Sequence, residues 1–288
     1  MSWKVMGFAA ALAAFASSAG HAAGPQAVWE TAGFQAPESA LYDPAADVVY
    51  VANINGPPGD KDGNGFISRV GADGVVQQMD WATGLNAPKG MAIHGSTLYV
   101  ADIDAQVEIS LADGKVLTRH EDPTAKFMND VAAGPDGTIW VSDSFTNRLY
   151  RLAGGKFEVW LENPDLDSPN GLYIEPDRVI VGSLGVFGEK GRPGRLLSVS
   201  MKDKSVTVLK DAVANLDAVE TDGAGGYYLT DWPGGRILHY SSGGELSTVL
   251  TLTAGTADMD VVLSKGMIYL PRMMDGKLAA FTLPAVAK

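Results

Sequence analysis

Short apolar segments alternate with tight turns along most of the chain, and one arrangement of them recurs six times. Each copy is a short apolar strand, a tight turn, and an aromatic or aliphatic residue that opens a second strand; residues 128–143 show it most clearly. The opening residues are 49, 41, 40, 48 and 41 positions apart: Tyr50, Tyr99, Trp140, Ile180, Tyr228 and Tyr269. Repeats of this length built from short strands are typical of propeller blades. The pattern therefore predicts an all-β fold, a six-bladed β-propeller.

Third and fourth strands follow in each copy, and their alternation of apolar and polar residues is typical of antiparallel sheet. Blade six is an exception, because the chain ends after its third strand, residues 276–282. Residues 31–37 closely match residues 82–88, which close blade one and lead into blade two. We therefore expect the N-terminal strand, residues 27–30, to complete the last blade and remove two exposed sheet edges. The alternative is an open array with frayed ends.

A polar residue recurs where the first strand of each blade begins. In blades one to five this position holds Glu38, Lys89, Asn129, Asn170 and Asp217. In blade six the apolar phase of Val261 and Leu263 favours Met259, which Asp258 and Asp260 flank. Strand propensity does not explain Asn and Asp at this position, because both are depleted in strands. A propeller arranges equivalent residues around one channel, so we expect these side chains to converge.

Two carboxylates and two amides that converge would form an all-oxygen site, which suits a hard cation such as Ca²⁺. A Zn²⁺ site would favour His or Cys, but the chain has no Cys, and its four His residues are scattered. The alternative is structural, because buried Asn and Asp at strand starts can simply satisfy backbone groups near the axis.

These markers give the sequence a resemblance to the SMP-30/gluconolactonase superfamily of six-bladed propellers, which includes regucalcin-like lactonases. Diisopropyl-fluorophosphatase and the paraoxonases are more distant relatives. The resemblance covers nearly the whole chain after residue 23, and it rests on Glu38 after Pro37, Asn129 after Met128, Asn170 before Gly171, and Asp217 after Leu216. It implies that Glu38, Asn170 and Asp217 hold one divalent cation, with Ca²⁺ favoured over Mg²⁺, Mn²⁺ or Zn²⁺. It also implies that Asn129 contacts the metal or the substrate, and that Asp217 acts as a base or nucleophile.

The function that follows is metal-dependent hydrolysis of a lactone or related ester. Phe127 stands where sugar-lactone enzymes of the family often carry Arg, and Lys89 should enter the same channel mouth. A lysine there would pair with Glu38 or with an anionic group of the substrate, so we do not expect a sugar-acid lactone. The alternative is a non-catalytic propeller that binds a small ligand or partner protein on the same face.

Two long loops, residues 55–65 and 184–194, connect second and third strands in the opposite blades one and four. We expect them to face each other across the channel mouth. Asp60, Asp62 and Asn64 match the start of a calcium loop, but Gly71 stands where the bidentate Glu belongs. A hairpin tip is favoured there, with a second ion as the alternative. We expect structural roles for two further sets: turn capping by Asp102, Asp143 and Asp231, and core packing by Trp81, Trp140, Trp160 and Trp232.

The first 23 residues read as a signal peptide. Lys4 precedes an apolar run, residues 5–16, and small residues with possible cleavage after Ala22 or Ala23 follow it. We expect one domain, residues 24–288, that is exported to the periplasm or secreted and has no membrane span after cleavage. A net charge of −12 argues against nucleic-acid partners and anionic membrane surfaces. The expected partner is a small-molecule substrate.

Overall fold

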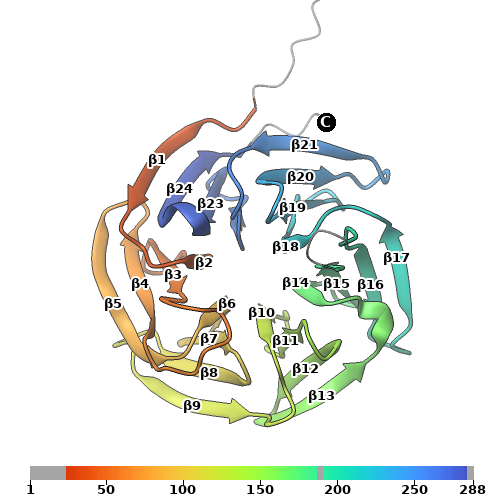
Figure 1. The fold of residues 1–288 in the computed structure, drawn as a ribbon, viewed down its shortest axis with the longest axis horizontal. Coiled ribbons are helices and arrows are strands. Elements are labelled where there is room, and N and C mark those ends of the chain that lie inside the picture. Colours follow the sequence, from red (N-terminus) through yellow and green to blue (C-terminus); the bar gives the residue numbers. More distant parts are fainter. Residues whose placement is uncertain (1–23, 187–190, 284–288) are drawn as a thin grey trace, which may run out of the picture.

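Six four-stranded antiparallel sheets stand around a central axis in the computed structural model, which describes residues 24–186 and 191–283 (Figure 1). The sequence-based prediction of a six-bladed all-β propeller is therefore confirmed. In blades one to five the strand nearest the axis is the first of its blade in chain order, and the fourth lies at the rim. The proposed signal peptide lies outside the described residues.

The strands of each blade are consecutive in sequence except in blade six. Blade one consists of β2 (Pro37–Asp43), β3 (Val48–Asn53), β4 (Gly65–Gly71) and β5 (Val76–Leu85). Blade two consists of β6 (Pro88–His94), β7 (Thr97–Asp102), β8 (Ala105–Ser110) and β9 (Val116–Glu121). Blade three consists of β10 (Met128–Ala133), β11 (Ile139–Asp143), β12 (Arg148–Ala153) and β13 (Lys156–Glu162).

The second half of the ring repeats this order. Blade four consists of β14 (Pro169–Ile174), β15 (Arg178–Ser183), β16 (Leu196–Ser200) and β17 (Val206–Lys210). Blade five consists of β18 (Leu216–Thr221), β19 (Tyr227–Asp231), β20 (Arg236–Tyr240) and β21 (Leu246–Thr251). Blade six consists of β22 (Asp260–Val262), β23 (Met267–Arg272), β24 (Lys277–Thr282) and, from the other end of the described chain, β1 (Ala27–Ala32).

Strand β1 completes blade six, as the sequence predicts. It pairs antiparallel with β24 from Ala27 opposite Phe281 to Ala32 opposite Lys277. The indole N–H of Trp29 also donates to the carbonyl oxygen of Ala72 in blade one, at 3.0 Å. The first strand of the propeller therefore joins the last blade to its neighbour.

The hydrophobic core is divided among the interfaces between blades. Blades one and two share a buried cluster that includes Tyr50 and Leu98, and blades three and four share another that includes Trp140 and Val181. Corresponding clusters lie at the other four interfaces. The second or third residue of each second strand, which is aromatic in every blade except blade four, thus packs against the adjacent blade, so burial of these side chains holds the ring together.

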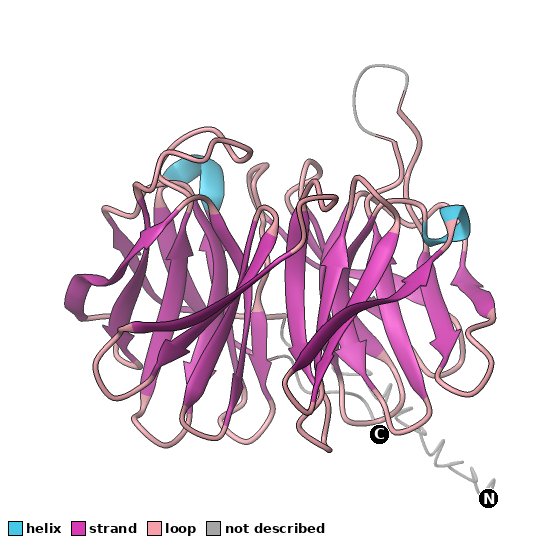
Figure 2. Ribbon diagram, turned by 90° about the horizontal axis from the view of Figure 1, so that it is seen from below, coloured by secondary structure: helices cyan, strands magenta, loops and turns pink. Residues whose placement is uncertain are grey.

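One face of the ring carries both short helical turns of the described chain, η1 (Pro164–Leu166) and η2 (Met273–Asp275) (Figure 2). Among the described residues, no helix has the length and hydropathy needed to cross a membrane.

Candidate functional site

A cavity of about 390 Å³ lies at the centre of the ring, and five of its twelve lining residues are the polar residues of the repeat. Each is the second residue of an innermost strand, and together we call them the polar ring: Glu38 (β2), Lys89 (β6), Asn129 (β10), Asn170 (β14) and Asp217 (β18). Met273 of η2 also lines the cavity, so the cavity belongs to the face with the helical turns. The predicted convergence of these five side chains is confirmed.

Blade six contributes a different residue from the one expected. An isolated bridge pairs Thr256 with Arg272, and this bridge corresponds to the first strand pair of the other blades, such as Leu216 with Asp231. The equivalent of Asp217 is therefore Ala257, and not Met259, which is buried against blade five. The prediction was wrong because the two positions are two residues apart, and alternation alone cannot separate positions of the same phase.

Asn170 and Asp217 are held together by a direct hydrogen bond. The side-chain amide of Asn170 donates to Asp217 Oδ1 at 2.7 Å and to the carbonyl oxygen of Leu216 at 3.3 Å. These two bonds leave the carbonyl oxygen of the Asn170 side chain as its group for a ligand. The adjacent Gly171 is required by packing, since a Cβ there would lie 2.1 Å from the Asp217 carbonyl oxygen.

Asn129 is positioned by a serine that the sequence analysis did not identify. Its amide donates to Ser144 Oγ at 3.1 Å, and Ser144 Oγ donates to the carbonyl oxygen of Pro169 at 2.8 Å. Ser144 therefore links the Asn129 side chain to the strand that carries Asn170. The only signal in the sequence was its position directly after Asp143, at the end of a second strand.

Glu38 is buried, and its Oε2 has no hydrogen-bond partner among the described residues. Burial, together with the nearby charges of Asp217 and Asp258, raises the pKa of Glu38 well above its ordinary value. Burial likewise raises the pKa of Asp217 to about 8; repulsion from Asp258 adds to this shift, and the hydrogen bond from Asn170 opposes it. An unpaired buried carboxylate is costly, so both groups favour a bound cation.

Lys89 supplies one positive charge but is already held by backbone groups. It is only 1% exposed, and its ammonium donates to the carbonyl oxygens of Ala87 at 2.8 Å and Pro58 at 3.0 Å. Burial lowers the pKa of Lys89 to about 8, although the charges of Glu38 and Asp102 oppose this shift. Pro58 belongs to the long loop of blade one, which therefore reaches over the lysine.

The residues present fit a hard divalent cation. The polar ring offers side-chain oxygens from Glu38, Asn170 and Asp217. Within residues 24–186 and 191–283, no His lines the cavity and Glu38 Oε2 has no hydrogen-bond partner. Three acidic or His side chains do not meet at one point among the described residues, so amide oxygens would have to complete the site.

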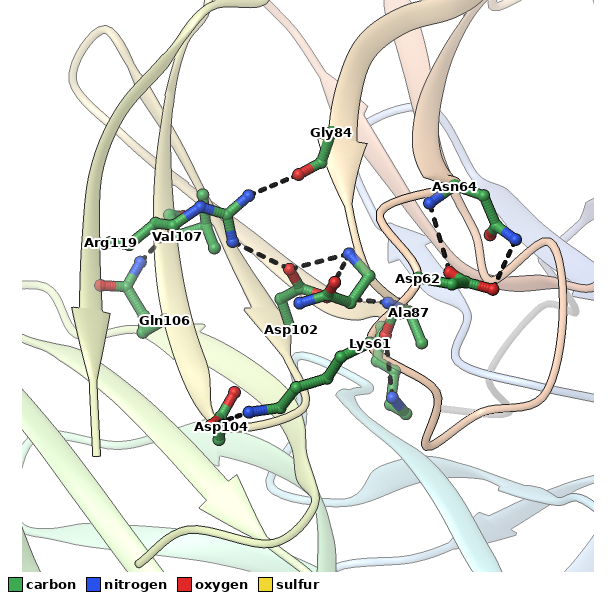
Figure 3. A network of polar contacts seen from close by, with 12 residues as sticks. Lys61, Asp62, Asn64, Gly84, Ala87, Asp102, Asp104, Gln106, Val107 and Arg119 are labelled. Atoms are coloured by element: carbon green, nitrogen blue, oxygen red, sulfur yellow. Dashed lines mark hydrogen bonds and ion pairs between the residues drawn. The ribbon is translucent and has the colours of Figure 1, made fainter. Parts of the chain in front are cut away.

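The aspartates that end second strands accept hydrogen bonds from backbone N–H groups of adjacent loops, which confirms the predicted turn capping by Asp102, Asp143 and Asp231. Asp102 accepts hydrogen bonds from the backbone N–H groups of Asn86 and Ala87 and from Arg119, which also donates to Gly84 (Figure 3). This network fixes Ala87, whose carbonyl oxygen binds Lys89.

The long loops of blades one and four both reach the cavity, through Pro58 and Leu184 respectively. Residues 187–190 of the second loop lie outside the described residues. At the tip of the first loop, the Asp62 carboxylate accepts hydrogen bonds from Asn64, and Lys61 pairs with Asp104 of blade two (Figure 3). The bonds between Asp62 and Asn64 are those of the hairpin tip that the sequence favoured.

Trp232 lines the cavity, so the prediction that it packs in the core was wrong. Trp81, Trp140 and Trp160 pack between blades, as expected. Trp232 directly follows β19, so the chain leaves the blade at the mouth of the channel.

Among the carboxylates that lie on or beside innermost strands and do not line the cavity, four have raised pKa values: Asp130, Glu220, Asp258 and Asp260. Burial raises the pKa of all four, to about 7 for Asp258 and about 6 for Asp260. Several of their bonds tie neighbouring blades together. Asp130 accepts from the Leu172 N–H at 2.6 Å, and Asp260 accepts from the Tyr42 N–H at 2.7 Å.

Solved structures with the same fold include proteins of the kind the sequence resembles. A gluconolactonase from Xanthomonas campestris is 16% identical, with a TM-score of 0.69 over 93% of this chain and 99% of its own. Regucalcin from Agrobacterium tumefaciens, described as a calcium-binding protein, is 16% identical, with a TM-score of 0.65 over 91% of this chain and 94% of its own. Virginiamycin B lyase from Staphylococcus aureus is 15% identical, with a TM-score of 0.58 over 88% and 98%.

No protein-family model matches the chain, and no curated protein matches it. At these identities the structural likeness is one of fold, and the resemblance to gluconolactonases and regucalcin is confirmed at that level. Because a lyase shares the architecture, the function has to be argued from the residues of the cavity.

Proposed function

We propose that the protein hydrolyses a lactone or related ester in the central cavity, with a divalent cation held by Glu38, Asn170 and Asp217. The observation that carries this proposal is the convergence of five polar residues on one cavity, in which a buried Glu38 oxygen has no partner in the described part of the chain. When bound, the cation, for which Ca²⁺ is the first candidate, would polarise the substrate carbonyl as a Lewis acid. The calcium-binding description of the regucalcin neighbour supports this choice.

The roles of the side chains follow from their surroundings. Asp217, fixed by Asn170, is the base that takes a proton from the attacking water, or the nucleophile itself. Asn129, fixed by Ser144, orients the substrate. Lys89, in blade two opposite Asp217 in blade five, contacts the substrate and partly balances the charge of Glu38.

Asp217→Asn tests the catalytic role. It should reduce hydrolysis by about 10²–10⁴-fold while the fold is preserved, because an amide cannot accept the proton. The assay requires saturating metal, so that weakened binding does not account for the loss. Asp177→Asn, at an exposed turn, is the matched control. If the wild-type protein hydrolyses no lactone, ester or phosphotriester with Ca²⁺, Mg²⁺, Mn²⁺ or Zn²⁺, the protein is a binding module and the enzymatic proposal is wrong.

Lys89→Met separates two roles of the lysine. If Lys89 binds the substrate, activity falls at saturating metal. If it only offsets the carboxylates, metal affinity rises and activity with saturating metal is kept, which would refute the substrate-binding role. Metal titration and kinetics on the same variant distinguish the two.

Export is a separate proposal that rests on residues 1–23. N-terminal sequencing of the mature protein should find its first residue at Ala23 or Gly24. A mature chain that retains Met1 would contradict export by signal-peptide cleavage.

A further inference from the structure

The lining of the cavity is divided into a polar part and an apolar part. All five polar residues belong to the polar ring, at the starts of innermost strands. The other seven have apolar side chains and lie outside the strands: Ile54, Pro58, Phe127, Phe145, Leu184, Trp232 and Met273. We call these seven the apolar wall. Apart from the indole N–H of Trp232 and the weakly accepting thioether of Met273, their side chains carry no hydrogen-bonding group.

Two phenylalanines form the best-defined part of the apolar wall. The rings of Phe127 and Phe145 are stacked, with centroids 4.4 Å apart and planes 18° apart. Lys89 Nζ lies 4.4 Å from the centroid of the Phe127 ring. The backbone N–H groups of both phenylalanines donate to Asp143 Oδ1, at 3.1 Å and 3.0 Å. The aromatic pair is therefore positioned by a buried carboxylate, which makes it a built part of the site.

The Phe145 side chain is 66% exposed although it lines the cavity. A ligand that covers it removes apolar area from water, which favours binding. A polyhydroxylated ring would gain little here, because its hydroxyl groups would lose water without finding partners on the apolar wall.

We propose that the cavity selects a lactone or ester with an alkyl or aryl substituent. The reacting carbonyl lies at the polar ring, and the substituent lies along Phe127 and Phe145. This substrate class rests on the proposed function. The volume of about 390 Å³ falls within the range of about 300–1,000 Å³ that is usual for small-molecule sites.

Lactams that resist hydrolysis test the inference by binding alone. Isothermal titration calorimetry would compare δ-valerolactam, its hexyl-substituted form and gluconolactam on the Ca²⁺-loaded protein. Each methylene group buried against the apolar wall should increase affinity by about threefold, so the hexyl form should bind at least about 30-fold more tightly than the parent. Equal affinity of the parent and hexyl forms, or tighter binding of gluconolactam, would overturn the inference.

Phe145→Ser provides the matching variant, because an exposed side chain can be replaced without loss of the fold. It should reduce the advantage of the hexyl group, measured as the ratio of the two lactam affinities in the same variant, by about tenfold. Val208→Ser, an exposed apolar residue on β17 in the outer part of blade four, is the control and should change neither affinity. An unaltered hexyl advantage in Phe145→Ser would contradict the assigned position of the substituent.

Hydrolysis of the corresponding lactones separates this inference from the proposed function. If hexyl-substituted lactam binds more tightly but no lactone is hydrolysed, the proposed function fails and the preference of the cavity for apolar substituents stands. If lactones are hydrolysed with a higher kcat/KM for gluconolactone than for the hexyl form, the proposed function stands and the inference fails.

Discussion

Glu38 combines a negative charge with a buried position and an oxygen that no described residue contacts by a hydrogen bond. Its stability in that position depends on a cation, either Lys89 or a bound metal ion. Substitution by Gln removes the charge of this side chain and keeps its shape. Glu38 is therefore the most informative residue at which to test metal binding.

Glu38→Gln should weaken binding of Ca²⁺ by at least about tenfold, because it keeps the size of the side chain and removes one of two carboxylate charges. Calcium titration of the metal-free protein gives the dissociation constant. Glu245→Gln, on the exposed surface of blade five, serves as the control and should have no effect. Equal calcium affinity of Glu38→Gln and the wild-type protein would remove Glu38 from the ligand set.

Ser144→Ala should lower kcat and leave calcium affinity nearly unchanged. The substitution removes the acceptor for the Asn129 amide and the donor to the Pro169 carbonyl oxygen, so the substrate-orienting side chain is no longer fixed. A buried group left without its partner costs about 1–3 kcal/mol, so unfolding should occur at a lower temperature. Ser144→Thr, which restores a hydroxyl, should recover part of kcat. Normal kcat in Ser144→Ala would show that Asn129 needs no such support.

At the scale of strands, β1 is joined to the ring by several kinds of contact. Besides its pairing with β24, Thr31 Oγ1 donates to the Gly74 carbonyl oxygen at 2.7 Å, and Glu30 pairs with Lys277 at 2.6 Å and with Arg272. The ring of Trp29 lies 6.0 Å from that of Tyr269. Loss of this strand would expose an edge of blade six.

Deletion of residues 24–31 should abolish cooperative unfolding or cause aggregation, since blade six would lose its outer strand. Trp29→Ala is a milder test and should lower the free energy of unfolding by about 2–4 kcal/mol. Val28→Ala, at an exposed neighbouring position, should change it by less than about 0.5 kcal/mol. A truncated protein that unfolds at the wild-type temperature would show that β1 does not close the ring.

The strands and their order could be predicted from the sequence because the same pattern of strands occurs six times along the chain. The five polar residues shared one position in that repeat, so their convergence followed from the fold. Met259 was misplaced because alternation fixes only the phase of a strand, and the pairing of Thr256 with Arg272 was needed to fix its register. The roles of Ser144 and of the apolar wall could not be predicted. These residues reach the cavity through the conformation of loops, which has no periodic pattern in the sequence.

Across the whole molecule, the centre of the ring contains more negative than positive charge. Glu220, Asp258 and Asp130 act electrostatically on one another, and Glu220 also faces the charge of Asp260. Their raised pKa values mean that the folded protein binds protons more tightly than the unfolded chain does. Their contribution to stability is therefore greatest at low pH and is lost as pH rises through the pKa of each group in the folded protein.

Asp260→Asn should increase the free energy of unfolding at pH 8 by the order of 1 kcal/mol and change it little at pH 4. The pKa of Asp260 in the folded protein is about 6, above its ordinary value of 3.8, so at pH 8 folding must bury the charged form. The asparagine keeps an oxygen acceptor for the Tyr42 N–H. Denaturant unfolding at both pH values, with EDTA present, measures the difference. A larger stabilisation at pH 4 than at pH 8 would show that the sign is wrong.

The closing strand also has a consequence for the order of events during synthesis. Glu30 and its partner Lys277 are 247 residues apart, so β1 leaves the ribosome long before the strand it pairs with exists. At about 5–20 residues per second, this wait lasts roughly 10–50 s. Throughout that interval β1 is an unpaired edge that a chaperone or another nascent chain can bind. The two ends of the propeller thus meet only after β24 has been synthesised, and the ring acquires its full cooperativity in that step.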